Sequence, residues 1–526
     1  MTAFAGTGWQ LRLTTRLERW QILLWTAGIA ALLAAITDSM ASLYPTAADR
    51  EQYAAINDAS PALRAINGPG HALDTPGGIV VFEVGGYLLV AVALMAVLGV
   101  TRLTRSEEEH GRAELALSTA TGTLASLAAA VLTMVATSAL IGATCAAVMM
   151  LLGLPADGAW AYGASVAAIG VFFVGVTALA AQVCGTAGET LGLSGLVIAA
   201  SYGIRAAGDV GDGELSAWSP FGWVQYAAPF ADTQRSWPLG IAAGAGLLLV
   251  TGAMAVRLRR DLGSALLTRG PGRPTAGPSL VGLLTATARV AAPAVAGWAL
   301  GGLFVGAVFG FAGDEVTKVF AATPEIGLLL GTGQAEATEG YLRLVVLLIA
   351  LLATGYAVSA LQRVRTTERN GLGDLTLAAS VSRTRWLLSG VLPSLLGSAV
   401  VLAAGTTALG GTFAGVTDDP GWMERVLSSG MWHLPAVWLV ASIAVALLGA
   451  LPRFFVAAWA LLAACVVIDM LGPALQLADG VSDVSPFAHV PQLPDVDPGT
   501  GVWVMGVASL VLLIVGDLGM RRRDLG

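Results

Sequence analysis

Charged residues are scarce in this sequence: only 12% of its 526 residues are Asp, Glu, Lys or Arg, whereas 56% are apolar. Soluble domains carry about 25% charged residues, so this composition excludes a soluble protein. Apolar runs of about 20 residues, enough to cross about 30 Å of hydrocarbon at 1.5 Å per residue, recur along the chain. We therefore predict an all-α polytopic membrane protein.

Twelve such runs predict about twelve transmembrane helices. The predicted spans are approximately 20–40, 80–101, 124–152, 161–184, 190–207, 238–256, 288–312, 341–361, 387–410, 432–450, 454–472 and 501–519. Tryptophans and arginines share residues 9–20, which predicts a helix in the membrane interface before the first span. The first apolar run is longer than the core of a signal peptide, so we expect it to be retained.

Lysine is almost absent. It occurs once, at Lys318, and the other 27 of the 28 basic residues are arginines. A Walker A loop needs Gly-x-x-x-x-Gly-Lys, and no such sequence surrounds Lys318. If ATP drives this protein, another chain must bind it.

Cysteine and histidine are also few. The three cysteines all fall in predicted spans, and the four histidines are scattered without the spacing of metal ligands. These residues are Cys145, Cys184, Cys465, His71, His110, His433 and His489. The sequence therefore indicates neither a disulfide framework nor a metal site, and we expect no cofactor in this chain and no nucleic-acid partner.

The basic residues predict the orientation in the membrane. Placing both termini in the cytoplasm puts most of the 28 basic residues on the cytoplasmic side, as the positive-inside rule favours. The loops on the other side are acidic, which is expected of a solvated face left over from this bias.

Two charged segments interrupt the apolar chain at equivalent places. The first charged segment, 102–118, reads RLTRSEEEHGRAELALS, and the second, 363–379, reads RVRTTERNGLGDLTLAA. An offset of 371 − 111 = 260 aligns the pairs Arg105/Arg365, Glu108/Glu368, Gly111/Gly371, Glu114/Asp374 and Leu115/Leu375. Good helix formers predict a short surface helix in the first segment. Because the pattern is repeated, we interpret 107–118 and 367–378 as docking elements; an ordinary solvated loop is the alternative.

The candidate partner-binding residues lie in these docking elements. They are Glu107, Glu108, Glu109, Gly111, Arg112, Glu114 and Leu115 in the first, and Glu368, Arg369, Gly371, Asp374 and Leu375 in the second. The two surfaces differ in charge, since 102–118 sums to 3 − 4 = −1 and 363–386 sums to 5 − 2 = +3. We therefore expect the two docking sites to be unequal.

Two further markers recur in the same order. They are SPF at 219–221 and 485–487, with an offset of 266, and RRDLG at 259–263 and 522–526, with an offset of 263. Nearly constant offsets indicate an internal duplication. Each half holds six predicted spans, an even number, so we predict two parallel six-helix repeats related by a pseudo-twofold axis normal to the membrane. The halves are assigned to 1–268 and 279–526, with a cytoplasmic linker at 269–278.

At two pairs of equivalent positions in or near the spans, the two halves carry opposite charges. Glu83 corresponds to Arg343 at an offset of 260, and Arg205 corresponds to Asp469 at 264. A charge in hydrocarbon is costly unless it snorkels or pairs. Our hypothesis is that Arg205 and Asp469 pair across the seam between the halves, with snorkelling as an equal alternative. Glu83 and Arg343 lie nearer the outer interface, where water or lipid headgroups would solvate them.

The remaining span residues are mostly Ala, Leu, Val and Gly. Gly302, Gly306 and Gly310 form a row of small residues in the seventh span, which predicts close helix packing. The sequence shows no series of intramembrane acids that would relay protons and no catalytic constellation, so we do not expect an enzyme.

The charged segments resemble those of a known family. SEEEHGRAELALST at 106–119 and NGLGDLTLAASVSRTRW at 370–386 are similar to the membrane permeases of ATP-binding-cassette exporters of the polyketide-antibiotic (tetronasin-resistance) type. The resemblance implies two fused six-helix halves in a bacterial plasma membrane and two separate ATPase subunits that bind ATP and Mg. It also implies that 107–118 and 367–378 couple ATP use to the helices. Arg383 and Arg385 have no basic counterpart at 122–126, so an asymmetric ATPase pair stays open.

We therefore expect the permease subunit of an ATP-driven exporter of hydrophobic or amphipathic compounds, such as antibiotics, drugs or lipids. The alternative is an ion-coupled secondary transporter with 6+6 repeats, and the third class is a polytopic membrane enzyme. The lack of proton-relay acids argues against the second class, and the lack of paired carboxylates argues against the third.

Overall fold

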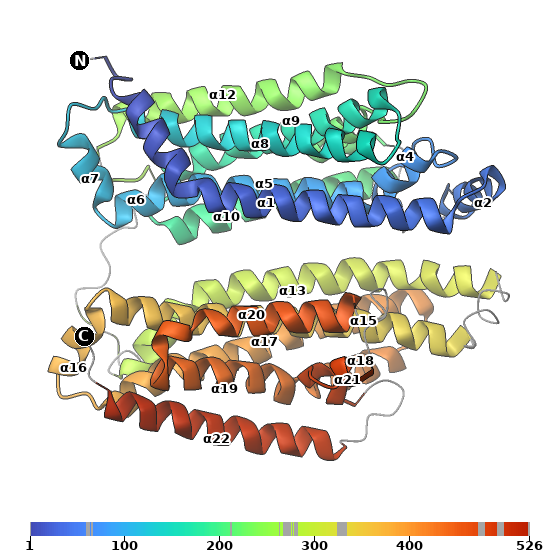
Figure 1. Ribbon diagram of the computed structural model, residues 1–526. Coiled ribbons are helices and arrows are strands. Elements are labelled where there is room, and N and C mark those ends of the chain that lie inside the picture. The colour runs from blue at the N-terminus through green and yellow to red at the C-terminus, as the bar shows by residue number, and fades with distance from the viewer. Residues whose placement is uncertain are drawn as a thin grey trace. The chain divides into compact units, whose positions relative to one another are not determined.

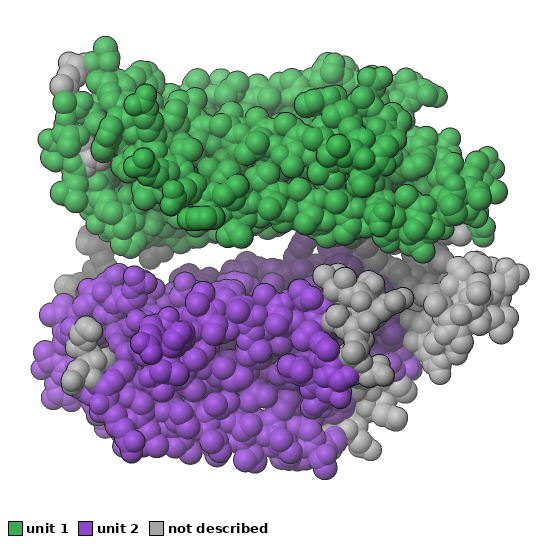
Figure 2. All heavy atoms as spheres, in the orientation of Figure 1, with its two compact units in different colours: residues 1–272 green, residues 273–526 purple. Residues whose placement is uncertain are grey.

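The computed structural model describes residues 2–58, 64, 67–210, 213–261, 263–266, 275, 277, 282–322, 334–471, 479–491 and 499–523. Helices are the regular elements formed by these residues. The chain divides into two compact units, Met1–Gly272 (unit 1) and Arg273–Gly526 (unit 2), and Figure 2 shows each unit as a closely packed body. The division falls within the predicted linker 269–278, of which only Thr275 and Gly277 are among the described residues.

Unit 1 is a bundle of long helices. They are α1 (Thr7–Leu43), α5 (Gly86–Leu103), α8 (Ala125–Leu151), α9 (Ala156–Val183), α10 (Ala187–Val210) and α12 (Trp237–Arg259). The shorter elements are α2 (Ala47–Asp58), α4 (Pro76–Val80), the π-helical η1 (Val81–Gly85), α6 (Arg105–Glu109), α7 (Arg112–Leu117), the 3-10 helix η2 (Leu215–Trp218) and α11 (Pro220–Gln225).

Unit 2 repeats this plan. Its long helices are α13 (Leu283–Ala322), α15 (Gln334–Arg369), α17 (Arg383–Thr417), α19 (Leu434–Ala450) and α22 (Thr500–Arg522), and α20 (Val456–Val466) forms a further span together with the short elements on either side of it. The shorter elements are α16 (Leu372–Ala378), α18 (Gly421–Met431), η4 (Pro452–Phe454), η5 (Val467–Leu471), α21 (Asp479–Ser482) and η6 (Pro486–His489).

The predicted membrane spans are confirmed as helices. Among the described residues, 12 helical stretches are long and apolar enough to cross a bilayer. They agree closely with the apolar runs in the sequence; for example, the predicted span 124–152 is the helix Ala125–Leu151. One difference concerns the N-terminus, where α1 runs without a break from Thr7 to Leu43. Figure 1 shows its first turns bent away from the rest, so the interfacial stretch and the first span belong to one bent helix.

Glycines allow neighbouring helices to cross at short distance in both units. A Cβ at Gly306 of α13 would lie 2.1 Å from the carbonyl oxygen of Gly405 in α17, and one at Gly310 would lie 1.8 Å from the Thr412 hydroxyl. The predicted packing role of the row of small residues at 302–310 is therefore confirmed. In unit 1, Gly142 of α8 and Gly163 of α9 make a similar crossing, since a Cβ on Gly142 would lie 2.3 Å from the Gly163 carbonyl oxygen.

Each bundle has two distinct ends. In unit 1, α6, α7 and the N-terminus lie at one end and α2 and α4 at the other; in unit 2, α16 and the C-terminus lie at one end and α18 and α21 at the other (Figure 1). We call the end that carries the charged segment the charged end of each unit. The core between the ends is formed mainly by the central helices α5 and α9 in unit 1 and by α15, α17 and α19 in unit 2.

Candidate functional site

Each charged segment is a helix, a glycine turn and a second short helix. In the first, α5 is followed by α6, and the chain turns at Gly111 into α7. In the second, α15 continues to Arg369, and the chain turns at Gly371 into α16. Both glycines have positive φ, 69° and 72°, a conformation that is strained for residues with a Cβ. The short helix predicted in the first segment is thus present, and the second segment has an equivalent one.

The first charged segment is fixed by an arginine cluster, which we define as Arg105, Glu108, Arg257 and Arg260. The Glu108 carboxylate accepts hydrogen bonds from Arg260 of 2.6 and 2.9 Å and one from Arg105 of 2.8 Å. Arg257 lies 3.6 Å from the same carboxylate. All four side chains are buried. One carboxylate therefore neutralises part of the charge of three buried arginines.

The second charged segment repeats this arrangement. Glu368 pairs with Arg523 at 2.6 Å and with Arg365 at 3.3 Å, and these three residues form the second arginine cluster. The two acids are separated by 260 residues, and Arg260 and Arg523 by 263, which are the offsets of the internal repeat. The same charged contacts therefore recur in both units. One member differs, because the residue at an offset of 263 from Arg257 is Met520.

The first segment is also attached to neighbouring backbone. Arg105 donates to the carbonyl oxygens of Gly185 and, at 3.0 Å, of Ser264. The Glu109 carboxylate accepts a 2.8 Å hydrogen bond from the backbone N–H of Ala187, the first residue of α10. A carboxylate at a helix N-terminus is stabilised by the exposed N–H groups there. The segment is thus connected to α5 by the chain, to α10 through Glu109 and to α12 through Glu108.

In unit 2, Arg383 at the start of α17, just beyond the second charged segment, attaches the end of the last helix. Arg383 donates hydrogen bonds to the carbonyl oxygens of Arg521 at 2.9 Å and Arg523 at 2.7 Å. A cation at the C-terminus of a helix is favourable because the final carbonyl oxygens lack helical partners. The basic residue that distinguishes the second half in the sequence therefore has a structural role, whereas Arg385 is exposed.

The short helices beyond the turns present the exposed part of the site. Leu115 of α7 and Leu375 of α16 are each 70% exposed, and the preceding acids, Glu114 and Asp374, are also exposed. Gly373 is the buried residue of α16, and a Cβ there would contact the Trp386 ring at 3.5 Å. Each unit thus presents an acid–leucine pair on a short helix, and in unit 2 this helix packs against Trp386.

The other candidate residues of the segments lie at their surface. Arg112 binds the Glu107 carboxylate with three hydrogen bonds of 2.6–3.0 Å, and these hydrogen bonds raise the pKa of Arg112 above its usual value. The Arg112 side chain is 52% exposed and that of Glu107 is 37% exposed. Arg369 is exposed as well. Such exposed charges add little to stability and remain accessible to a partner.

At the opposite end, Arg205 and Asp469 have partners in their own units. Arg205 is fully buried, lies 3.4 Å from Asp209 and stacks 4.2 Å from the centre of the Tyr202 ring. Asp469 accepts a 2.5 Å hydrogen bond from Ser485, the serine of the repeated SPF motif. Each charge is therefore accommodated locally, and pairing between Arg205 and Asp469 stays a prediction.

Glu83 and Arg343 also lie at this end. Glu83 accepts a hydrogen bond from the Tyr53 hydroxyl, and burial together with the Glu83 charge raises the pKa of Tyr53. Arg343 lies 3.7 Å from Glu339, one turn earlier in α15. Arg343 and Asp469 line one pocket of about 310 Å³ in unit 2. The charges assigned to different pairs in the sequence thus share a pocket within one half.

Several residues of the site were missed by sequence reasoning. Arg260 and Arg523 were used only as markers of the repeat, although each binds the acid of its charged segment. Glu18, which pairs with Arg102, was not considered. One signal in the sequence pointed to Arg260 and Arg523. They are charged in both halves, and their offset of 263 is close to the offset of 260 between Glu108 and Glu368.

Comparison with known proteins agrees with this architecture. The family described as multidrug efflux system permease Rv1217c, C-terminal domain, matches residues 10–257 and 280–521, one stretch in each unit. The multidrug efflux system permease protein Rv1217c of Mycobacterium tuberculosis (strain ATCC 25618 / H37Rv) is 33% identical over 532 aligned residues, which cover 99% of this chain and 96% of the relative. Twelve apolar helices, the repeated charged segments and this full-length similarity show that the chain belongs to the multidrug efflux permease family.

Proposed function

We propose that this chain is the permease of an ATP-driven exporter of hydrophobic or amphipathic compounds and that separate ATPase subunits dock on its two charged segments. The observation that carries the proposal is the duplicated arrangement of an arginine cluster around one glutamate, a glycine turn and an exposed acid–leucine pair. The ATP-binding-cassette type of exporter that the sequence resembles uses such paired elements.

The exposed leucines support a docking role. Leu115 and Leu375 occupy equivalent places on α7 and α16 and are equally exposed, beside an acid in both cases. An apolar side chain surrounded by charge on a preorganised helix is suited to enter a pocket on a partner protein. Two such elements suit two ATPase subunits.

The proposed mechanism uses the partner as its energy source. The charged ends of both units face the cytoplasm, because segments rich in arginine are retained on that side of the membrane. ATP is available there. ATP binding closes the ATPase pair, moves the two docking elements and shifts the helices between inward-open and outward-open states. The mostly apolar spans suit a cargo with few polar groups, because fewer polar groups are left unpaired during passage.

Co-purification with the ATPase tests the proposal. The permease is expressed together with a candidate ATP-binding-cassette ATPase from the same organism, and any complex is isolated through a tag on the permease. We expect Leu115→Glu combined with Leu375→Glu to abolish co-purification. Leu215→Glu is the matched control, because Leu215 is exposed in η2 at the opposite end of unit 1, and this variant should retain the ATPase.

Transport measurements give the second part of the test. Vanadate, which blocks ATPases of this kind, should stop cargo efflux, whereas collapse of the proton gradient should leave it unchanged at constant ATP. Efflux that survives vanadate but requires the proton gradient, in a permease that retains no ATPase, would instead establish a secondary transporter.

A further inference from the structure

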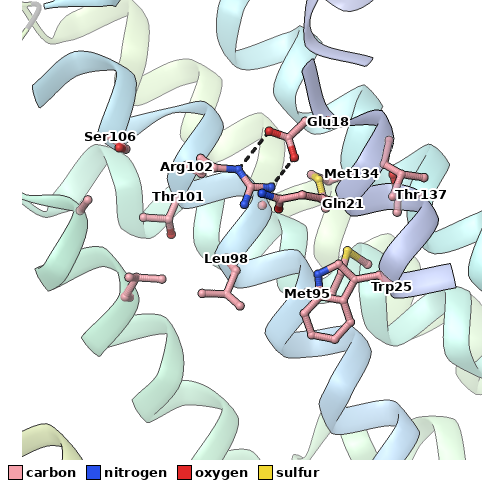
Figure 3. A pocket seen from close by; sticks show the side chains of 14 residues that line it. Glu18, Gln21, Trp25, Met95, Leu98, Thr101, Arg102, Ser106, Met134 and Thr137 are labelled. Carbon is pink, nitrogen blue, oxygen red and sulfur yellow. Dashed lines mark hydrogen bonds and ion pairs between the residues drawn. The ribbon is translucent and has the colours of Figure 1, made fainter. Parts of the chain in front are cut away.

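A pocket of about 270 Å³ lies near the charged end of unit 1, with α1 and α10 on either side and α5 at its base. Figure 3 shows Trp25 and Met95 on one side of it and the Glu18–Arg102 pair above them. Leu98, Met134, Ile22 and Leu191 add to the apolar part of the wall. Methionine and tryptophan side chains provide a large apolar surface, and methionine adapts to ligands of different shape.

The charged pair in this pocket is internally neutral. Arg102 donates to the two carboxylate oxygens of Glu18 through Nε and Nη2. In this side-on geometry, Nη1 is directed away from Glu18, and among the described residues it has no hydrogen-bond partner. The pair thus offers N–H donors to a ligand without offering net charge.

A second polar group in the wall lacks a partner. Thr101 is 2% exposed, and its hydroxyl has no hydrogen-bond partner among the described residues. A buried hydroxyl without a partner costs about 1–3 kcal/mol, so rotation of the Thr101 side chain toward a ligand that supplies an acceptor recovers this energy. Thr101 and Arg102 are adjacent in the wall of the same pocket.

The geometry points to a binding site for uncharged, mainly apolar molecules that carry an oxygen acceptor, such as a ketone, ester, amide or ether. The oxygen would accept from Arg102 Nη1 or the Thr101 hydroxyl, and the apolar body would lie against Trp25, Met95 and Met134. A charged head group would be disfavoured, because it would be desolvated beside a pair that is already neutral. The site holds a small ligand or one end of a larger one, since typical ligand pockets measure about 300–1,000 Å³.

The second half does not repeat this chemistry. At an offset of 260, Leu361 and Gln362 replace Thr101 and Arg102. Gln362 instead accepts a 2.7 Å hydrogen bond from the Trp459 indole. The binding site is therefore specific to unit 1. Its assignment to cargo rests on the proposed export function, whereas binding itself can be measured on the permease alone.

Photolabelling with benzophenone tests the binding site. Benzophenone is a neutral apolar ketone that reacts on illumination preferentially with methionine, so in phospholipid nanodiscs it should label Met95 and Met134 saturably, as mapped by mass spectrometry. Fluorenone should compete, whereas fluorene, which has the same ring system without the oxygen, should compete about tenfold less well because the hydrogen bond is lost. Equal competition by the two compounds, or no saturable labelling of these methionines, would overturn the inference.

Variants locate the site and its polar contact. Leu98→Trp fills the pocket and should abolish the labelling, whereas Leu94→Trp, at another exposed position of α5 outside the pocket, should leave it intact. Thr101→Val keeps the shape of the side chain and should weaken fluorenone competition about three- to tenfold, the range expected for one neutral hydrogen bond. Unchanged competition in Thr101→Val together with unchanged labelling in Leu98→Trp would place the ligand elsewhere.

The cargo assignment has its own measurement. Cells that carry the complete transporter should release tritiated fluorenone in an energy-dependent manner, and Leu98→Trp should slow this release while Leu94→Trp does not. If photolabelling behaves as expected but release is the same in both variants, the pocket binds such molecules without lying on the export path, and the assignment to cargo is wrong.

Discussion

Glu108 is the residue on which the first charged segment most depends. Its single carboxylate lies against Arg105, Arg257 and Arg260, all buried. Glu108→Gln preserves the shape of the side chain but removes the negative charge, and breaking a buried ion pair costs about 3–5 kcal/mol. We expect the purified variant to lose stability of this order, measured as a lower midpoint of thermal or denaturant unfolding.

Glu107→Gln is the matched control for this prediction. Glu107 belongs to the same segment, but its pair with Arg112 is exposed, and exposed pairs contribute about 0–1 kcal/mol. Its unfolding midpoint should stay close to that of the unmodified protein. Similar losses in both variants would show that the cluster does not depend on the Glu108 charge.

Gly111 and Gly371 give a second prediction at this scale. A Cβ at either position would meet nothing within 4 Å, so an alanine there is opposed only by the backbone conformation. The left-handed conformation costs a residue with a Cβ about 1–2 kcal/mol, and asparagine tolerates it better than alanine. Gly111→Ala and Gly371→Ala should each weaken association with the ATPase, and Gly111→Asn and Gly371→Asn should restore most of it, as measured by co-purification.

The two glycines also test the equivalence of the two segments. Because their φ angles differ by only a few degrees, the two alanine variants should have similar effects. If neither substitution alters association, the turn geometry is not required for docking.

At the scale of the helices, the crossing of α13 and α17 depends on Gly306. An added methyl group there would lie 2.1 Å from a backbone oxygen of α17, whereas at Gly301, on the same helix, it would meet nothing within 4 Å. Gly306→Ala should therefore destabilise the protein by about 1–3 kcal/mol through overpacking. Gly301→Ala should be neutral or stabilising by up to about 1 kcal/mol, since alanine favours helix.

The same glycine-to-alanine substitution should therefore lower the free energy of unfolding at Gly306 and leave it unchanged or raise it at Gly301. Thermal unfolding of the purified chain measures both. A neutral Gly306→Ala variant would show that α13 and α17 can separate without loss, and the crossing would then not hold unit 2 together.

The helices also show which features could be predicted from the sequence. Apolar runs located the spans because a bilayer requires about 20 apolar residues in each crossing helix. The continuity of α1 was not predicted, because the sequence between Trp9 and Trp20 changes in polarity but not in its ability to form a helix. Polarity marks where a helix meets water or lipid, whereas backbone propensity decides where the helix ends.

The candidate site was predicted only in part. The exposed leucines and the glycine turns follow from local sequence and from the repeat. The partner of Glu108 does not, because Arg260 lies 152 residues away and no local pattern connects them. Arg205 shows the opposite case, since a charge that seemed to need a partner in the other half has Asp209 one turn further along its own helix.

For the whole molecule, the native cysteines make the membrane orientation measurable. Cys145, Cys184 and Cys465 are all buried, and burial raises the pKa of the Cys184 thiol, which lies between two spans. A thiol that is buried and protonated reacts slowly with maleimides. The unmodified chain should therefore show little labelling, which makes it a suitable background for introduced cysteines.

Two introduced cysteines then report the two ends of unit 1. Ser118 follows α7 at the charged end, and Thr233 precedes α12 at the other end; both are exposed. An impermeant maleimide applied to intact cells should label Thr233→Cys, and it should label Ser118→Cys only after permeabilisation. Labelling of Ser118→Cys in intact cells would reverse the proposed orientation and remove the access of a cytoplasmic ATPase to the charged segment.

The three attachments of the first charged segment have a mechanical consequence. A force applied at Leu115 reaches α5 through the chain, α10 through Glu109 and α12 through Glu108. No one of these helices can be displaced by such a push while the other two stay still, unless a buried ion pair or a helix-terminal hydrogen bond breaks first. If a partner pushes on this segment, α5, α10 and α12, which are three of the six long helices of unit 1, are expected to move together.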